Sequence, residues 1–320
     1  MALDPDFKKW LEKRFKNKVK FNESMAGHTS FRVGGPADAY VLPERLEDLV
    51  ELVNRSRQNG LPYTVIGGGT NLLVKDSGIR GIVICLAKCL KKITAKNAGN
   101  RSVMVTAMAG ARTKALCRFA IDNGLKGMNF SLGIPGTVGG AIMMNAGTVY
   151  GSMDGVLDSI NVLMPTGRIK KIKRENIDFS YRSVTWDEES RNSGGTSPII
   201  LEGCFRLYAS DSTELKTEAE AILKIRKKRQ PTSSYSAGCF FKNPESGKPA
   251  GQLIEMAGLK GKKIRRAQVS RQHANFIINR VDSSSGATAA DILELMNMVQ
   301  ERVSKMFDIK LEPEVKIVGT

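Results

Sequence analysis

Short apolar runs alternate with amphipathic stretches along the first two thirds of the chain. The runs "AYVLP", "PYTVIGGGTNLLV", "GIVICL" and "RSVMVTAMAG" predict strands, the second of them broken by a glycine turn. "PERLEDLVELVNRSRQNG" predicts a helix that ends at Gly60, and "RTKALCRFAIDNGL" predicts another that ends at Gly124. The first of these helices carries one apolar face, made of Leu46, Leu49, Val50 and Val53.

The same alternation continues to the C-terminus. "INVLMPTGRIKKI" predicts a hairpin turning at 165–167, and "PIILEGCFRLY" predicts a strand. "DSTELKTEAEAILKIRKKR" predicts a helix that stops before Pro231, and "QVSRQHANFIIN" predicts further strands. A long helix is expected from Thr288, with Asp291 completing a capping box. Its buried face is expected to hold Ile292, Leu295, Val299, Val303 and Met306.

Two segments fall outside this alternation. The opening "MALDPDFKKWLEKRFKNKVKF" has the pattern of an amphipathic helix and lacks the apolar centre of a secretory signal. The polar stretch 185–198 is rich in Gly and Ser and predicts a surface loop. No apolar run approaches the roughly 20 residues that cross a bilayer. These features predict a cytoplasmic protein with no membrane partner.

The length and composition of the chain indicate the number of domains and the redox state of its surroundings. The chain has 320 residues, of which 41% are hydrophobic, enough for about two domains. Its five cysteines show no dense spacing, which is typical of a reducing compartment. Cys85 and Cys89 form an isolated pair and the chain has only two histidines, so we expect no structural metal site and interpret Cys85 as strand core.

The net charge of +17 limits the class of partner. A solvated basic surface, a nucleic acid and small phosphorylated ligands would each explain such a charge. Lys and Arg are spread along the chain, with one tight run in "KIRKKRQP", and no aromatic motif for stacking bases accompanies them. This distribution favours anionic small molecules over nucleic acid.

Two glycine-rich segments are the main candidates for a binding site. "VIGGGTNLLV" (65–74) follows a strand, and its consecutive glycines allow backbone N–H groups to converge on an anion. It lacks the spacing of a Rossmann fingerprint, because position 72 is Leu. "GIPGTVGGAIMMNAG" (133–147) predicts a chain that lies flat against a ligand, with Thr137 and Asn145 offering side-chain hydrogen bonds. Each could be a tight turn without a ligand, but together they indicate one large cofactor.

Two polar stretches carry candidate chemistry. In "DFSYRS" (178–183), Arg182 could clamp a carboxylate with two hydrogen bonds, or it could be an ordinary surface arginine. In "SAGCFFKNP" (236–244), Cys239 stands beside two phenylalanines and is followed by Asn243. It could be a reactive thiol or a small buried core residue.

Seven segments, in this order, resemble the UDP-N-acetylenolpyruvoylglucosamine reductase (MurB) family. They are "HTSFRVGGPAD", "VIGGGTNLLV", "GIPGTVGGAIMMNAG", "FSYRS", "SAGCFFKNP", "AGQLIEMAGLKG" and "LEPEV". The resemblance covers residues 21–319, and the short connection after "FSYRS" is similar to that of the family's second type. It implies an α+β fold, in which an FAD-binding domain of the para-cresol methylhydroxylase type, built of two α/β lobes, accompanies a smaller α+β substrate-binding domain. Together with the chain pattern it implies a helical segment 1–23, an FAD domain 24–210 split near 88, and a substrate domain 211–320.

The resemblance also implies site residues. Non-covalent FAD would be held by Gly67, Gly68, Gly69, Thr70, Asn71, Leu72, Gly133, Ile134, Pro135, Gly136, Thr137, Gly139, Gly140, Asn145, Ala146 and Gly147. Arg182, Cys239 and Glu314 would be catalytic, and Arg229, Asn243 and His273 would bind substrate.

The implied reaction uses NADPH to reduce FAD, which then passes hydride to C3 of UDP-N-acetylglucosamine enolpyruvate while a proton reaches C2. Many relatives have serine where this chain has Cys239, and a thiol is a stronger acid than an alcohol hydroxyl. Arg182 would pair with the substrate carboxylate, with Glu314 polarising the same region. We expect a monomer acting on small molecules. An FAD oxidase of the same fold acting on another substrate and a basic nucleic-acid-binding protein are the alternatives.

Overall fold

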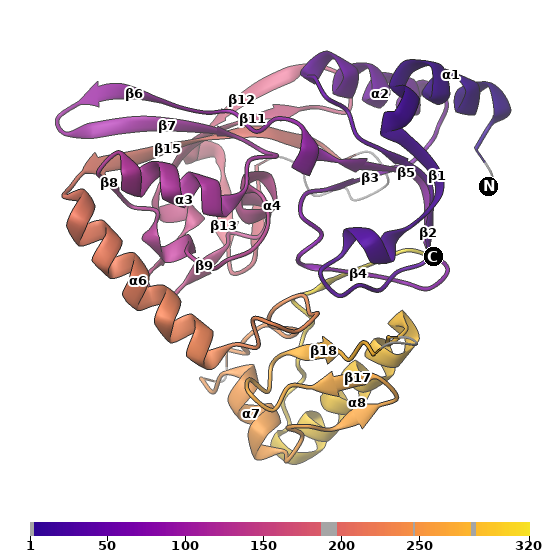
Figure 1. The fold of residues 1–320 in the computed structure, drawn as a ribbon, viewed down its shortest axis with the longest axis vertical. Helices are drawn as coiled ribbons and strands as arrows, with labels where there is room; N and C mark the ends of the chain where they lie inside the picture. The colour runs from indigo at the N-terminus through magenta and orange to yellow at the C-terminus, as the bar shows by residue number, and fades with distance from the viewer. Residues whose placement is uncertain (1–2, 187–196, 246, 283–285) are drawn as a thin grey trace. The chain divides into compact units, whose positions relative to one another are not determined.

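The computed structural model describes residues 3–186, 197–245, 247–282 and 286–320 (Figure 1). They form two compact units built from interleaved segments. The first unit comprises Met1–Phe21, Ala39–Gly68 and Gly81–Lys224, and the second comprises Asn22–Asp38, Gly69–Arg80 and Ile225–Thr320. The boundaries expected from the sequence follow chain order, whereas each compact unit collects segments that lie far apart in the chain.

The N-terminal part holds two helices and a small sheet. The sheet has the order β1 (Val19–Ser24), β2 (Pro36–Val41), β5 (Ile79–Cys85) and β3 (Tyr63–Ile66), with β3 and β5 parallel. Helices α1 (Pro5–Phe15) and α2 (Leu46–Gln58) lie side by side (Figure 1), and Arg14 of α1 bonds Glu51 of α2 at 2.7 Å. The opening segment is α-helical from Pro5 to Phe15, and one 3₁₀ turn (Lys16–Lys18) then leads into β1.

A six-stranded antiparallel sheet forms the larger part of the first unit. Its order is β12 (Ile169–Lys173), β11 (Leu157–Leu163), β15 (Ile199–Ala209), β7 (Ser102–Met108) and β6 (Ile93–Gly99), and β8 (Leu125–Lys126) also pairs with β15. The β11–β12 hairpin confirms the turn predicted at 165–167. Helices α3 (Thr113–Asp122) and α4 (Val138–Met143) bury apolar faces in the same core. Two short hairpins, β9 (Gly147–Thr148) with β10 (Gly151–Ser152) and β13 (Asp178–Ser180) with β14 (Ser183–Thr185), complete the unit.

The second unit has its own core. It contains the sheet β16 (Lys263–Ile264), β17 (Ala267–Val269) and β18 (Ile277–Asn279), the helices α7 (Ala250–Met256) and α8 (Ala289–Phe307), and the parallel pair β4 (Leu72–Val74) and β19 (Lys316–Val318). Phe31, Val33 and Leu73 lie in this core together with Phe240 and Phe241. Burial of these side chains holds segments 22–38 and 69–80 to the C-terminal part of the chain.

Helix α8 tests the sequence pattern closely. Thr288 and Asp291 form the predicted capping box. The expected face is buried through Val303, but Met306 is 43% exposed, so that part of the prediction is wrong. Met306 lies in the last turn, near the C-cap at Asp308, where the helix has passed the edge of the core.

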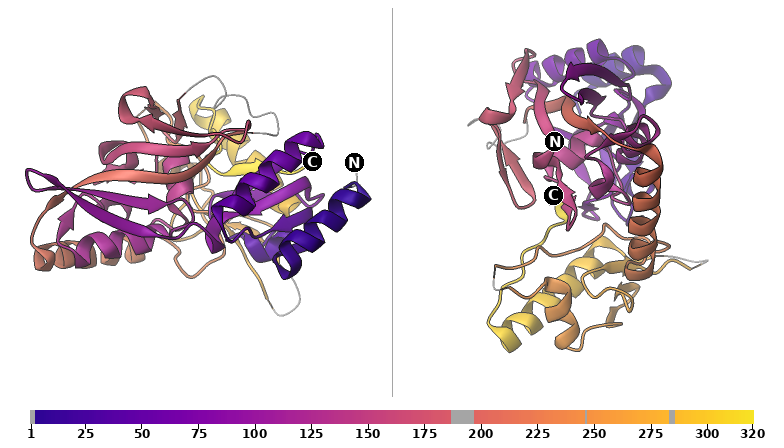
Figure 2. Two further views of the ribbon diagram at one scale, coloured as in Figure 1. Left: turned by 90° about the horizontal axis from the view of Figure 1, so that it is seen from above. Right: turned by 90° about the vertical axis from the view of Figure 1, so that its left-hand side faces the viewer.

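Helix α6 (Ser212–Arg229) confirms the predicted helix before Pro231 and is a single long helix in Figure 2. Its N-terminal part buries Leu215, Ala219 and Ile222 in the first core. Cys85 ends β5 and is buried, as expected. Most of the surface loop expected at 185–198 lies outside the described residues. Among the helices the structure describes, none is both long and apolar enough to cross a membrane.

Candidate active site

The first glycine-rich segment forms the expected turn between β3 and β4. A Cβ atom on Gly67 would lie 2.2 Å from the Thr137 hydroxyl oxygen. One on Gly69, whose φ is +63°, would lie 1.9 Å from the His28 carbonyl oxygen. The packing of the protein itself therefore requires glycine at both positions. Thr137 also brings the second glycine-rich segment against the first.

The N–H groups of this turn bear on ligand binding. Within the described part of the chain, the N–H groups of Gly68 and Gly69 make no hydrogen bond, although Gly69 is buried. Buried backbone N–H groups are almost always paired with protein or with a bound group. Neighbouring N–H groups in a glycine turn bind anions. The turn therefore fits a phosphate-bearing cofactor such as FAD.

The second glycine-rich segment begins as a turn. Gly133 and Gly136 have φ of +76° and +121°, conformations that favour glycine. Thr113 fixes this turn, since its hydroxyl donates to the Ile134 carbonyl at 2.7 Å and its N–H donates to the Gly136 carbonyl at 3.2 Å.

The segment then departs from its predicted form. The sequence suggested a flat stretch, but residues Val138–Met143 form helix α4. Gly139 packs this helix closely, because a Cβ atom there would lie 2.9 Å from the Ala109 side chain. Gly140 is exposed, with no atom within 3.4 Å of its Cβ position. Of these two glycines, only Gly140 leaves space for a ligand.

Asn145 links this segment to the hairpin that carries Arg182. Its side-chain oxygen accepts from the Asp154 N–H at 3.1 Å, and its amide nitrogen donates to the Ser180 carbonyl at 3.4 Å. The side chain is thus bonded within the protein, whereas the sequence suggested that it would contact a ligand. Its φ is +37°, an unusual value for a residue other than glycine.

Arg182 occupies the two-residue turn between β13 and β14. Its φ is +61°, an unusual value for a residue other than glycine, but one that two-residue hairpin turns favour. The guanidinium donates to the carbonyls of Asn145 at 3.5 Å and Gly147 at 3.4 Å, and it stacks on Tyr181 at 5.0 Å. These contacts orient the guanidinium from the second glycine-rich segment.

Cys239 is half-buried and precedes a tightly fixed pair of phenylalanines. The Phe240 N–H donates to the Asn275 carbonyl at 2.7 Å. The Asn275 side chain accepts from the Phe241 N–H at 2.9 Å and donates to the Phe241 carbonyl at 2.8 Å. Arg226 is an electrostatic neighbour of Cys239, and burial lowers the pKa of its guanidinium. The backbone at the thiol is therefore fixed, and a cation lies near it.

Glu314 lies beside this pair and beside the first glycine turn. Its N–H donates to the Phe240 carbonyl at 2.8 Å. Its own carbonyl accepts from the side-chain amide of Asn71 at 3.2 Å, and the Asn71 carbonyl accepts from the Lys316 N–H at 3.0 Å. These bonds begin the parallel pairing of β4 with β19. Asn71, Glu314 and the backbone next to Cys239 thus form one hydrogen-bonded group.

Arg229 and His273 line one pocket of about 570 Å³, together with Ile225, Lys228 and Gln272. Gln272 donates to the carbonyls of Lys227 at 3.2 Å and Lys228 at 3.1 Å, which secures the C-terminal turn of α6. The pocket therefore has two cations at its edge, a feature that suits an anionic group.

The His273 ring is held in one orientation. Its Nδ1 accepts from the Asn275 N–H at 3.2 Å, so a neutral ring carries its proton on Nε2. Burial, together with the nearby Lys260, lowers the pKa of His273. Asn243 does not line the pocket; its side-chain oxygen accepts from the Ala250 N–H at 3.0 Å, at the start of α7.

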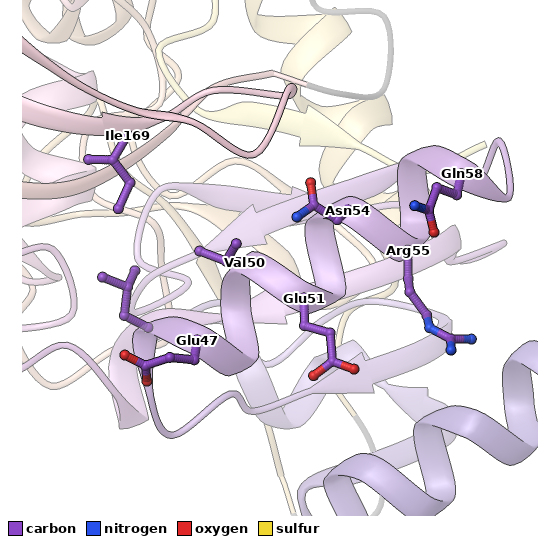
Figure 3. Close-up of a pocket in the computed structure, with 8 residues that line it drawn as sticks. Glu47, Val50, Glu51, Asn54, Arg55, Gln58 and Ile169 are labelled. Carbon is purple, nitrogen blue, oxygen red and sulfur yellow. The ribbon is translucent and has the colours of Figure 1, made fainter.

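A second pocket, of about 550 Å³, lies on the exposed side of α2 and is shown in Figure 3. Its lining comes from α2 and from Ile169 of β12, and includes none of the predicted site residues. Among the described residues, no group of three or more His, Cys, Asp or Glu side chains could hold a metal ion.

Comparisons with known proteins bear on the family of this chain. A family profile described as the C-terminal domain of UDP-N-acetylenolpyruvoylglucosamine reductase matches residues 230–318, and one described as an FAD binding domain matches residues 37–173. A curated UDP-N-acetylenolpyruvoylglucosamine reductase from Desulfosudis oleivorans is 45% identical over 317 residues, which cover 99% of this chain and 100% of that protein. The chain belongs to the UDP-N-acetylenolpyruvoylglucosamine reductase family.

Other members of the reductase family are similar over nearly the same length. The reductase of Listeria innocua is 39% identical, over 94% of this chain and 95% of that protein. The crystal structure of the reductase (MurB) from Thermus caldophilus has a TM-score of 0.75 at 32% identity, and the match covers 93% of this chain and 98% of that one. The predicted family and the α+β flavin-binding fold are therefore confirmed.

The two family profiles cover different groups of the candidate residues. Both glycine-rich segments fall within the FAD-binding match, and Cys239, Asn243, His273 and Glu314 fall within the C-terminal match. Arg182 lies outside both matches, so its position rests on the hairpin geometry described above.

Two residues that contact this site were not predicted. Asn275 fixes the backbone after Cys239, and Gln272 secures the turn that carries Arg229. Both belong to "QHAN", a polar interruption in an otherwise strand-like stretch. For Asn275 that interruption was the available signal, because its side chain is buried and a buried polar side chain needs a specific partner. Gln272 is exposed, so the same argument does not apply to it.

Proposed function

We propose that the chain is an NADPH-dependent flavin reductase that converts UDP-N-acetylglucosamine enolpyruvate to UDP-N-acetylmuramate in peptidoglycan synthesis. The observation that carries this proposal is the 45% identity to a reductase of that name over 99% of the chain. The N–H groups of Gly68 and Gly69, which make no hydrogen bond among the residues that the structure describes, support FAD as the cofactor.

FAD, when bound, supplies hydride transfer from NADPH to the C3 carbon of the enolpyruvyl group. The cofactor would be held by backbone groups of Gly67–Leu72 and by Gly133–Gly140, including the exposed Gly140. Gly67 and Thr137 bring these two segments into contact, so a single large cofactor can use both.

Arg182 binds the substrate carboxylate in this proposal. A guanidinium has five N–H donors, and the two long bonds to Asn145 and Gly147 orient it. Negative charge builds on the carboxylate side of the enolpyruvyl group as C3 gains hydride. A fixed guanidinium stabilises that charge without first having to reorient.

Cys239 holds the proton that reaches C2. The bonds that Asn275 makes to Phe240 and Phe241 fix the backbone next to the thiol, so little reorganisation is needed when the proton moves. Glu314 is held beside Phe240 by its own N–H and polarises the same region of the substrate.

The pocket at the end of α6 binds the diphosphate of the substrate. Lys228 and Arg229 supply positive charge at its edge, and the neutral His273 ring can donate from Nε2. Asn243 contributes from the adjoining loop, where its oxygen already binds the start of α7.

The chain acts as a monomer in the cytoplasm, without nucleic-acid or membrane partners. The proposed reactants, a UDP-sugar and NADPH, are small cytoplasmic anions, and the net charge of +17 attracts such ligands.

The test follows the flavin absorbance of the purified full-length protein without oxygen. NADPH should bleach the flavin band, and UDP-N-acetylglucosamine enolpyruvate should restore it. A flavin that stays bleached with this substrate and recovers only when oxygen is then admitted would point to an oxidase. A colourless protein that shifts DNA with a steep salt dependence would overturn the proposal in favour of a nucleic-acid-binding protein.

A further inference from the structure

We propose that Ser30 completes the phosphate site of the first glycine turn, with its hydroxyl donating to the diphosphate of the bound dinucleotide. This inference rests on one part of the proposed function, namely that the cofactor is a dinucleotide and therefore carries a diphosphate. Ser30 lies in "HTSFRVGGPAD", a motif of the resemblance to which no role was assigned.

Ser30 is joined directly to the turn. Its N–H donates to the Gly69 carbonyl at 3.0 Å. The residues before it press on the same glycine, since a Cβ atom on Gly69 would lie 1.9 Å from the His28 carbonyl oxygen and 3.1 Å from the Thr29 Cα atom. Both segments belong to the second compact unit, so this contact lies within one folded body.

The Ser30 hydroxyl is buried and has no hydrogen-bond partner among the residues that the structure describes. Leaving a buried hydroxyl unpaired costs free energy, so such a group needs a specific explanation. Within the described part of the chain the N–H of Gly69 also makes no hydrogen bond, and Gly69, which Ser30 contacts, is a buried residue. Two donors without partners on adjoining residues are what an anion would satisfy.

The turn is fixed at both ends, which keeps these donors in place. The Gly69 carbonyl is bonded to Ser30 and the Asn71 carbonyl to Lys316, so the local backbone is ordered before a ligand arrives. A phosphate oxygen that accepts from the Ser30 hydroxyl and the Gly69 N–H gains charge-assisted hydrogen bonds without an ordering cost.

The test uses Ser30→Ala in the full-length protein, freed of flavin and titrated with FAD. Loss of one charge-assisted hydrogen bond should weaken FAD binding about 10- to 100-fold. Riboflavin has no phosphate, and its affinity should not change. The deflavinated variant should resist urea as well as the parent, because the removed hydroxyl has no partner in the protein. Ser24→Ala is the matched control, since its exposed hydroxyl bonds Gly34 in the same segment, and it should alter neither quantity.

Three results would overturn the assignment: unchanged FAD affinity in Ser30→Ala, an equal loss for riboflavin, or a deflavinated variant that unfolds in less urea than the parent. The last result would show that the hydroxyl supports the fold. Failure of the reductase proposal is distinct. A parent protein that binds FAD tightly but reduces no enolpyruvyl substrate would leave the role of Ser30 intact.

Discussion

The side-chain amide of Asn71 donates to the backbone carbonyl of Glu314 at 3.2 Å, across 243 positions of sequence. One hydrogen bond thereby connects the glycine turn proposed to hold FAD with the glutamate proposed to act on the substrate. The Glu314 N–H in turn reaches Phe240, the residue after Cys239. A displacement of this turn is therefore expected to move Glu314 and the backbone next to Cys239.

Replacing Asn71 with alanine should disturb that connection. The lost bond should lower the free energy of unfolding by about 1 kcal/mol. It should also slow flavin reoxidation by substrate more than flavin reduction by NADPH, because the Glu314 backbone keeps its bond to Phe240 but loses the one to Asn71. Anaerobic stopped-flow absorbance separates the two steps. Asn59→Ala removes only an exposed bond at the end of α2 and is the control. Equal slowing of both steps would contradict the proposed coupling.

Two substitutions at Cys239 should separate proton donation from packing. Cys239→Ser keeps a proton donor and should retain activity. Cys239→Ala should leave reduction by NADPH unchanged and slow reoxidation by substrate about 100-fold or more, the usual range for loss of a general acid. The same stopped-flow experiment reports both rates. If the alanine variant runs both steps at the parent rate, Cys239 is not the proton donor.

Arg182 should act only when the substrate is present. Arg182→Lys keeps the positive charge but loses the planar fork that binds a carboxylate with two hydrogen bonds. We expect normal reduction by NADPH and a reoxidation step at least about 10-fold slower, with Arg182→Ala slower still. Arg174→Lys is the control, because Arg174 also stacks on an aromatic ring, Phe179, and lies on the exposed surface. Impaired flavin reduction in Arg182→Lys would instead indicate a role in cofactor or NADPH binding.

Two glycines should respond to alanine in opposite ways. Gly69→Ala puts a Cβ atom 1.9 Å from the His28 carbonyl oxygen at a φ of +63°, and should destabilise the protein by more than about 2 kcal/mol. Gly140→Ala lies in a helix with open space around it and should stabilise the deflavinated protein by about 0.5–1 kcal/mol. If Gly140 faces the cofactor, its variant should nevertheless bind FAD more weakly. Urea unfolding and FAD titration measure the two effects, and unchanged FAD affinity would remove Gly140 from the site.

His273 should make stability depend on pH. Burial lowers its pKa in the folded protein, so the unfolded chain binds a proton at a higher pH than the folded one. The stability that the neutral His273 ring contributes to the folded protein is therefore complete above the ordinary histidine pKa of about 6.5. It is lost as the pH falls below that value. The urea concentration at the midpoint of unfolding should decrease when the pH is lowered from 7.5 to 5. The decrease should be smaller in His273→Gln. Parallel curves for parent and variant would show that His273 does not titrate in this way.

The sequence by itself determined most of the local structure and most of the candidate residues. Periodicity placed α2, α3, α6 and α8, and the capping box began α8 at the expected residue, because these signals depend on neighbours within a few positions. The motifs located both glycine-rich segments and the stretches that carry Arg182, Cys239 and Glu314, since each is a short run of unusual composition.

Only the tertiary structure decided which of these residues meet. The pairing of β4 with β19 joins Asn71 to Glu314, and packing on Gly69 brings in Ser30, although neither pair is close in sequence. Residues 138–143 form a helix despite two glycines, and it is a tertiary contact that requires one of them, because a Cβ atom on Gly139 would collide with Ala109. Such contacts depend on burial and close approach between distant segments, which no local pattern encodes.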